Sequence, residues 1–577
     1  MENIKNIIIK IFNNNLIMFG LIVCLGMIIC VSVGYQDTRW DFTNYHYYNA
    51  FAFLNNRLNY DIVPSSINTF FNPLLDLPLY FYIEKFNNHP NIVVALQGIW
   101  YGCLLFAFYK ITTLFFDNKT LEGNFKSILA LAIASTGQAV FFQSSASANE
   151  ISIAFFSFIS LYFIFKMIKY PNEQKSYKYF LCGLLLGCAL GLKSTLIYIC
   201  ISTGLSLILC FKYLSKPIKF ILLLALGGFV GYLITNGWWM YKMWNLYQNP
   251  FFPFLNEVFK SPYFDNINYL DRRFIPPISK AIIFPYIWAS KKYRSAEIVF
   301  SDFRGPVFYT LSLLFFIYMT IKAKRWKDLF TDKKLYFFFT IFVFLSYVLW
   351  LSIFSIYRYI IVVEMLSALF FVKIIFSYKT NKTLNFILYY SIMSVICGVL
   401  IFNFKHGFGW PKYNLDKGFV YMETVKMPEN SLLKLYNFPT SGVIPILAKY
   451  NSFRALGYNH HNLKHMEGSD FVERGKFREI RDNIEKEHKG REIIIYRILP
   501  QHNSRYVILL NYIEKEIEGK YCRKLENNLD NKLYICVPEE LKDEILPDGD
   551  NTKSINHIEE YKISQEINKK IYKSKIK

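Results

Sequence analysis

The feature that most constrains this chain is a series of apolar runs, each about as long as a bilayer-crossing helix. They fall at approximately 12–34, 91–116, 127–143, 151–168, 179–193, 194–211, 219–240, 306–323, 335–354, 359–377 and 384–402. A helix needs roughly 20 mostly apolar residues to cross the hydrocarbon core. We therefore expect a mostly α, polytopic membrane protein with about 11 transmembrane helices.

The lysines and arginines between these runs indicate which side each connection occupies. Connections rich in positive charge follow the second, fourth, sixth, eighth and tenth runs, whereas the alternate short connections 144–149 and 355–357 carry no lysine or arginine. Because cytoplasmic loops carry the excess of lysine and arginine, the N-terminus is predicted to be cytoplasmic. The same bias explains the net charge of +22 without a nucleic-acid partner, and membrane lipids are the expected surroundings.

The start of the chain, MENIKNIIIKIFNNNLIMFGLIVCLGMIICVSVGY, lacks a well-placed small-residue cleavage pattern and precedes many further apolar runs. We interpret it as a retained first span rather than a cleaved signal peptide. The high Asn, Lys and Ile content fits an AT-rich genome, so we expect a multi-pass protein of a bacterial inner (cytoplasmic) membrane.

The predicted organisation has three parts. A transmembrane domain covers residues 1–402 and carries external loops at 35–90 and 241–305. Segments such as SLLKLYNFPTSGVIPILAKY and REIIIYRIL mix strand-like and helix-permissive stretches, which predicts a small extracytoplasmic α/β domain at 403–538. The charged tail 539–577 has few large apolar clusters and is expected to be helical or disordered.

Two of the ten cysteines stand apart from the others. Eight lie in apolar runs, where cysteine behaves as a small apolar residue, but Cys522 and Cys536 lie in the polar C-terminal region. Their segment, YCRKLENNLDNKLYIC, reads as two strand-like pieces joined by a turn. A disulfide between them is expected, since an external domain occupies an oxidising compartment.

The first external loop carries the leading candidates for catalysis. Asp37 and Asp41 follow the first apolar run directly, and Asp41 opens an aromatic stretch that we interpret as a helix. A carboxylate can accept the proton of an attacking hydroxyl group. The alternative for Asp41 is a helix N-cap. His46 is either a polar member of this helix or part of the site.

Cationic candidates occur on later external segments. Arg358 lies between two tyrosines at the outer end of the tenth run, where it either pairs with a phosphate or anchors the interface. Lys193 lies at a tip between two runs, and Arg272 and Arg273 lie in the second large loop; each is a phosphate ligand or an interfacial anchor.

Two glutamates complete the candidate set. Glu150 opens the fourth run from outside, as a helix-start carboxylate or as a second acid in the site. Glu364, deeper than Arg358, is costly in lipid and is expected to face the protein interior.

The order of these features resembles the GT-C superfamily of integral membrane glycosyltransferases. The resemblance rests on the acid-bearing first loop with TNYHYY, on ALGLKSTLIY at 189–198, on NPFFPFLNEVFKSPYF at 249–264, and on IYRYIIVVEML at 356–366. It covers approximately residues 1–400. The chain departs from the commoner members because its first loop has no adjacent pair of acids, and Glu150 replaces the aspartate often found in the second external loop.

The resemblance implies an inverting transfer on the outer face of the membrane. The donor would be a polyprenyl-phosphate-linked sugar, and the acceptor a surface glycan, lipid or protein. Asp41 or Asp37 would be the base, and Arg358 would contact the donor phosphate. No cofactor is assigned. The two departures from the commoner members, the missing pair of adjacent acids and Glu150 in place of an aspartate, leave open whether a divalent metal takes part.

Three other functions fit parts of the pattern. A surface-polysaccharide polymerase or ligase also uses lipid-linked sugars, but its arginines are expected in a large late loop. A transporter or flippase would carry charges at mid-membrane and inverted repeats, for which the sequence gives little sign. A non-catalytic membrane scaffold is the third alternative.

Overall fold

The structure is a computed structural model of the chain. It describes residues 2–33, 40–145, 147, 149–171, 175–267, 272–290, 302–322, 334–376, 394, 396, 398, 417–437, 439–458, 471–498, 513–530, 532–546 and 552–553. The chain divides into two compact units. Unit 1 comprises Met1–Tyr35, Val94–Trp238 and Leu270–Pro411, and unit 2 comprises Gln36–Val93, Trp239–Tyr269 and Lys412–Lys577.

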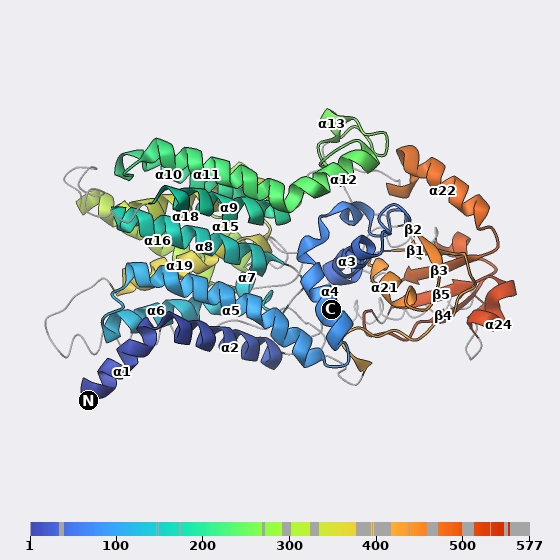
Figure 1. Cartoon of the computed structure of the whole chain (residues 1–577), viewed down its shortest axis with the longest axis horizontal. Helices are drawn as coiled ribbons and strands as arrows, with labels where there is room; N and C mark the ends of the chain where they lie inside the picture. Colours follow the sequence, from blue (N-terminus) through green and yellow to red (C-terminus); the bar gives the residue numbers. More distant parts are fainter. Residues whose placement is uncertain are drawn as a thin grey trace, which may run out of the picture. The chain divides into compact units, whose positions relative to one another are not determined.

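Unit 1 is helical, and its long helices lie alongside one another (Figure 1). Pro90 and Pro217 stand at the first positions of two helices, where the missing N–H breaks no intrahelical hydrogen bond. The helices are α1 (Glu2–Asn13), α2 (Asn15–Val33), α5 (Pro90–Phe115), α6 (Leu121–Ser135), α7 (Gln138–Phe141), α8 (Glu150–Lys169), α9 (Ser176–Leu192), α10 (Ile197–Leu209), α11 (Pro217–Tyr232), α14 (Ile278–Ala281), α15 (Phe284–Ser290), α16 (Arg304–Lys322), α18 (Lys334–Ile353) and α19 (Ile361–Ile375).

Among the described residues, five helices are long and apolar enough to cross a membrane. They cover Asn15–Ser32, Pro90–Phe115, Glu150–Lys169, Pro217–Tyr247 and Lys334–Ile353. Several of the other predicted runs form shorter helices: α6 and α19 have 15 residues each, α9 has 17 and α10 has 13. The run predicted at 384–402 lies almost wholly outside the described residues.

Helices α9 and α11 pack with their backbones in contact, because glycine lines the seam on both sides. A Cβ atom added at Gly187 would lie 2.0 Å from the carbonyl oxygen of Gly228, and one at Gly183 would lie 2.0 Å from that of Leu224. From the other side, a Cβ at Gly227 would lie 2.0 Å from the carbonyl oxygen of Phe180. Small residues spaced four apart permit this close approach between helices in a membrane.

Unit 2 contains a six-stranded sheet in the order β2-β1-β3-β5-β4-β6 (Figure 1). Strand β1 is parallel to both β2 and β3, whereas β5 is antiparallel to β3 and β4, and β6 is antiparallel to β4. The strands are β1 (Ser431–Tyr436), β2 (Phe453–Tyr458), β3 (Glu492–Arg497), β4 (Tyr521–Lys524), β5 (Leu533–Val537) and β6 (Thr552–Lys553), with helices α21 (Ile444–Leu447), α22 (Gly475–Glu487) and α24 (Lys542–Ile545). The expected C-terminal α/β region is therefore present, and α24 and β6 fall within the predicted tail.

Residues 36–93 and 239–269, which include most of the first and the first part of the second segment predicted to be external, belong to the same unit as this sheet, whereas residues 270–305 belong to unit 1. The first forms a π-helical turn η1 (Phe42–His46), α3 (Tyr47–Leu54), the short helices η2 (Ser66–Phe70) and η3 (Pro73–Leu75), and α4 (Leu77–Phe86); the second forms α12 (Trp238–Tyr247) and α13 (Asn256–Phe259). Ile62 adds a parallel bridge to β2: its N–H donates to Ala455 O at 2.8 Å, and its carbonyl accepts from Gly457 N at 3.0 Å.

A buried ion pair fixes this connection. Asp61 accepts from Nε and Nη2 of Arg57, both at 2.7 Å, from the amide of Ala455 at 3.0 Å and from the Tyr48 hydroxyl at 3.1 Å. Burial and the neighbouring Asp61 raise the pKa of Tyr48 well above its usual value, so the phenol stays a hydrogen-bond donor. Arg57 also donates to Phe453 O at 2.9 Å.

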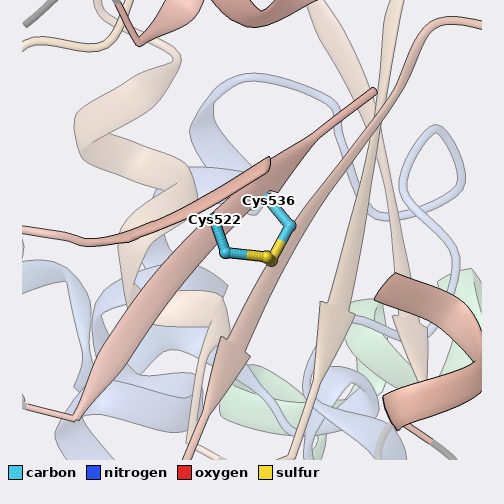
Figure 2. Close-up of a disulfide and its surroundings, with 2 residues drawn as sticks. All are labelled: Cys522 and Cys536. Carbon is cyan, nitrogen blue, oxygen red and sulfur yellow. A yellow bond between two sulfur atoms is a disulfide. The ribbon is translucent and has the colours of Figure 1, made fainter. Parts of the chain in front are cut away.

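Cys522 and Cys536 form a disulfide between β4 and β5, as expected (Figure 2). The two residues are directly opposite each other in the antiparallel pair. The strand–turn–strand interpretation of this segment is confirmed. The run RYVILLNYI lies almost entirely outside the described residues.

Candidate functional site

The structure brings together three of the candidate residues that lie far apart in the sequence. Glu150, Lys193 and Arg358 meet in unit 1, where α8 begins, α9 ends and the chain enters α19. Lys193 Nζ lies 2.7 Å from Glu150 Oε1, and Arg358 Nε lies 4.0 Å from the same oxygen. We call these three residues the cationic cluster.

The cluster combines a buried acid with two partly exposed bases. The side chain of Glu150 is 2% exposed, whereas those of Lys193 and Arg358 are 18% and 24% exposed. One carboxylate shared by two cations leaves a local charge of about +1 when all three are ionised. Such an arrangement can bind an anionic group, and a guanidinium matches the geometry of phosphate oxygens.

The turn that carries Arg358 is held by its backbone. Gln143 Nε2 donates to the carbonyl of Arg358 at 2.8 Å, and the Tyr198 hydroxyl donates to the carbonyl of Tyr359 at 2.7 Å. The guanidinium of Arg358 lies over the ring of Tyr359, 5.1 Å from its centroid. Hydrogen bonds to its backbone therefore hold the turn in place. The guanidinium of Arg358 is oriented separately, by Glu150 and Tyr359.

Glu364 faces the protein interior, as predicted. Its carboxylate accepts from the Tyr357 hydroxyl at 2.7 Å and from the amides of Ala139 and Val140 at 3.3 and 3.2 Å. A Cβ at Gly137 would lie 2.3 Å from Glu364 Oε2, so this approach requires glycine there. Since Tyr357 precedes Arg358, the turn carries a cation of the cluster and also binds this second buried acid.

Sequence reasoning missed the buried pair Asp302–Arg304. Arg304 Nη2 lies 2.7 Å from Asp302 Oδ2, its Nε donates to the same carboxylate, and its Nη1 donates to the Thr136 hydroxyl at 3.1 Å. Both residues are about 97% buried. The available signal was an acid and a base two residues apart, where an apolar helix begins.

Arg272 and Arg273 are exposed in the loop before α14. The guanidinium of Arg273 lies 5.4 Å from the centroid of the Phe274 ring. A cation stacked on a neighbouring aromatic ring at the surface favours the interfacial-anchor interpretation of this pair.

Asp41 and His46 belong to unit 2. Asp41 is buried, adopts helical backbone angles and makes no capping hydrogen bond, so the N-cap interpretation is wrong. The predicted helix is present, but it contains the π-helical turn η1, which shifts the faces that regular α-helical spacing predicts. Asp37 lies outside the described residues.

His46 is part of a buried His–Asp pair. Its Nδ1 lies 2.6 Å from Asp76 Oδ1, and both residues are about 5% exposed. The carboxylate of Asp76 orients the imidazole through Nδ1, so that Nε2 is the ring nitrogen that does not contact Asp76. This pairing was not visible from the sequence, since Asp76 lies 30 residues from His46.

Within the described part of the chain, no group of three or more His, Cys, Asp or Glu side chains is arranged to hold a metal ion. No protein-family model matches this sequence, and no curated protein matches it.

Proposed function

We propose that this protein is a membrane glycosyltransferase. It moves a sugar from a polyprenyl-phosphate donor to a surface glycan, lipid or protein acceptor on the outer face of a bacterial inner membrane. The observation that carries the proposal is the cationic cluster, in which Lys193 and Arg358 share the carboxylate of Glu150 at one end of apolar helices.

The side of the membrane follows from the charge pattern. Lys166, Lys169, Lys175 and Lys178 lie between α8 and α9 or in their adjoining ends, whereas the cluster lies where α8 begins and α9 ends. With positive charge on the cytoplasmic side, the cluster faces outward at the headgroup level. The same proposal includes about 11 spans, a cytoplasmic N-terminus and an external C-terminal domain.

The proposed chemistry is a displacement at the anomeric carbon of the donor sugar. An acceptor oxygen forms the new bond to this carbon, and the bond to the phosphate oxygen breaks with its electron pair. Negative charge accumulates on the leaving phosphate, and Lys193 and Arg358 stabilise it. The acceptor proton passes to a carboxylate, for which the resemblance assigns Asp41, with Asp37 as the alternative.

The test is transfer of labelled sugar from polyprenyl-phosphate donors in membranes. Arg358→Met should raise the donor KM about tenfold or more, because a charge-assisted hydrogen bond contributes about 1.5–3 kcal/mol. Lys280→Met serves as the control, since Lys280 is an exposed cation on α14 outside the cluster. Asp41→Asn should lower kcat by about 10²–10⁴ with normal protein abundance.

The outcomes separate the alternatives. An unchanged donor KM in Arg358→Met would remove the cluster from donor binding. Full activity in Asp41→Asn would move the base to Asp37 or Glu150. If wild-type protein extends a polysaccharide instead of adding single sugars, the polymerase function replaces the proposal. If it carries lipid-linked sugar across vesicles without transfer, the flippase function does.

A further inference from the structure

Several buried polar atoms in unit 2 have no hydrogen-bond partner among the described residues. Asn44 is fully buried, and both its Nδ2 and its Oδ1 are unpartnered; the same holds for His46 Nε2, Asn49 Oδ1 and Thr440 Oγ1. Native structures leave few such groups unsatisfied, and water or a ligand accounts for most exceptions. Four of these atoms lie on η1 and the first turn of α3, and the fifth lies in the loop after β1.

These two segments are held against each other. The Ser65 hydroxyl donates to the carbonyl of Asn44 at 2.7 Å and lies 2.7 Å from Ser441 Oγ. The Ser441 hydroxyl also donates to the carbonyl of Asn44. A Cβ at Gly442 would lie 2.6 Å from the carbonyl oxygen of Thr43. Asn44 therefore lies at this junction, and Thr440 lies one residue before Ser441, which is part of it.

The sheet topology marks the same place as a binding position. From β1 the chain passes to β2 on one side, and then through α22 to β3 on the other side of β1. Ligands of doubly wound sheets bind outside the carboxyl ends of the strands where the order reverses in this way. Asn437, directly after β1, bridges this point: its Nδ2 donates to the carbonyl of Arg497 at the end of β3.

The unpartnered groups are amides, a hydroxyl and an imidazole nitrogen. An asparagine side chain offers two donors and one acceptor oxygen, which suits a hydroxyl group that both donates and accepts. Aromatic rings adjoin them: Tyr45 lies 4.1 Å from the His46 ring and 5.5 Å from that of Phe71, between centroids. The buried carboxylates of Asp41, three residues before Asn44, and of Asp76, in contact with His46, disfavour an anionic ligand.

We propose that η1 and the loop after β1 form a binding site for a neutral polyhydroxylated ligand, namely a sugar unit. Its hydroxyl groups would hydrogen-bond Asn44 and Thr440, with an aromatic ring against its apolar face. Because these atoms are buried, ligand entry requires the surrounding side chains to separate. Sugar binding at this site does not depend on the proposed function. Its role as the acceptor site of the transferase rests on the proposed function.

The test is saccharide binding to the full-length purified protein with no donor present. Saturation-transfer difference NMR with neutral methyl hexopyranosides and methyl N-acetylhexosaminides should show saturable binding, and inorganic phosphate should not compete. Asn44→Leu should weaken binding about tenfold or more, and Thr440→Val severalfold, since each removes hydrogen-bonding groups. Thr112→Val, a buried isosteric change in unit 1, is the matched control and should leave binding unchanged.

The stability of Asn44→Leu distinguishes a ligand site from a structural water site. Replacing an unpartnered buried amide by an apolar side chain of similar shape should leave folding intact or improve it. The proposal would be overturned if Asn44→Leu were more stable and bound saccharides as wild type does, or if wild type bound no saccharide. If Asn44→Leu does not fold, unchanged saccharide binding by Thr440→Val would overturn it. Because the donor is absent, lost sugar transfer with intact saccharide binding would count against the transferase alone.

Discussion

The buried pair Arg57–Asp61 should contribute strongly to the stability of unit 2, and Asp61→Asn tests this. The Asp61 side chain is 0% exposed and accepts four hydrogen bonds, two from Arg57 and one each from Tyr48 and Ala455. The substitution leaves the guanidinium of Arg57, 12% exposed, without its counter-charge. Removing one partner of a buried pair costs about 3–5 kcal/mol.

This loss corresponds to a Tm decrease of about 6–20 °C, at roughly 2–4 °C per kcal/mol for a unit of this size. The assay is thermal unfolding in detergent, with hydrogen exchange at the Ala455 amide reporting on the junction with β2. Glu122→Gln is the control: the Glu122–Lys126 pair is an i,i+4 pair with Glu122 52% exposed, so it should cost less than about 1 kcal/mol.

A double-mutant cycle isolates the interaction between the two side chains. Arg57→Met combined with Asp61→Leu should destabilise unit 2 less than the sum of the single changes, because no unpaired charge is left buried. A cost below about 1 kcal/mol for Asp61→Asn, together with unchanged exchange at Ala455, would refute the reasoning. It would show that Arg57 finds another partner or reaches water when the carboxylate is lost.

Two further predictions concern packing and covalent structure. Gly187→Ala should destabilise unit 1 by about 1–3 kcal/mol, because its Cβ would meet the Gly228 carbonyl, whereas Gly204→Ala, with nothing within 4 Å, should stabilise α10 by about 0.5–1 kcal/mol. Equal changes in Tm for Gly187→Ala and Gly204→Ala would contradict the close backbone contact between α9 and α11. Replacing Cys522 and Cys536 by alanine should cost about 3 kcal/mol for a separation of 14 residues, and alkylation of the denatured wild type without reductant should leave both sulfurs unmodified.

The sequence was sufficient for features that depend on neighbouring residues. Apolar runs specify helices because each run can satisfy its own backbone hydrogen bonds in lipid. The hairpin of Cys522 and Cys536 is likewise local, since two short strands joined by a turn bring both cysteines into register. The inward orientation of Glu364 followed from the cost of placing a carboxylate in lipid.

The pairing of distant residues was decided only by the tertiary structure. Glu150, Lys193 and Arg358 were each recognisable as charges at the ends of apolar runs, but their shared contact depends on which helices become neighbours. Arg304 and Asp302 were missed for a related reason, because burial of a charge at a helix start depends on the residues packed around it.

Unit 2 shows the same limit on a larger scale. Its sheet was expected from β-branched segments. The pairing of β2 with Ile62, in the first of the segments predicted to be external, joins residues nearly 400 positions apart in the chain. The π-helical turn that carries Asn44 likewise disrupts the spacing from which a helix face is read. Hydrophobic periodicity depends on neighbouring residues and can therefore be read from the sequence. Contacts between distant segments depend on how the whole chain folds, so only the tertiary structure decides them.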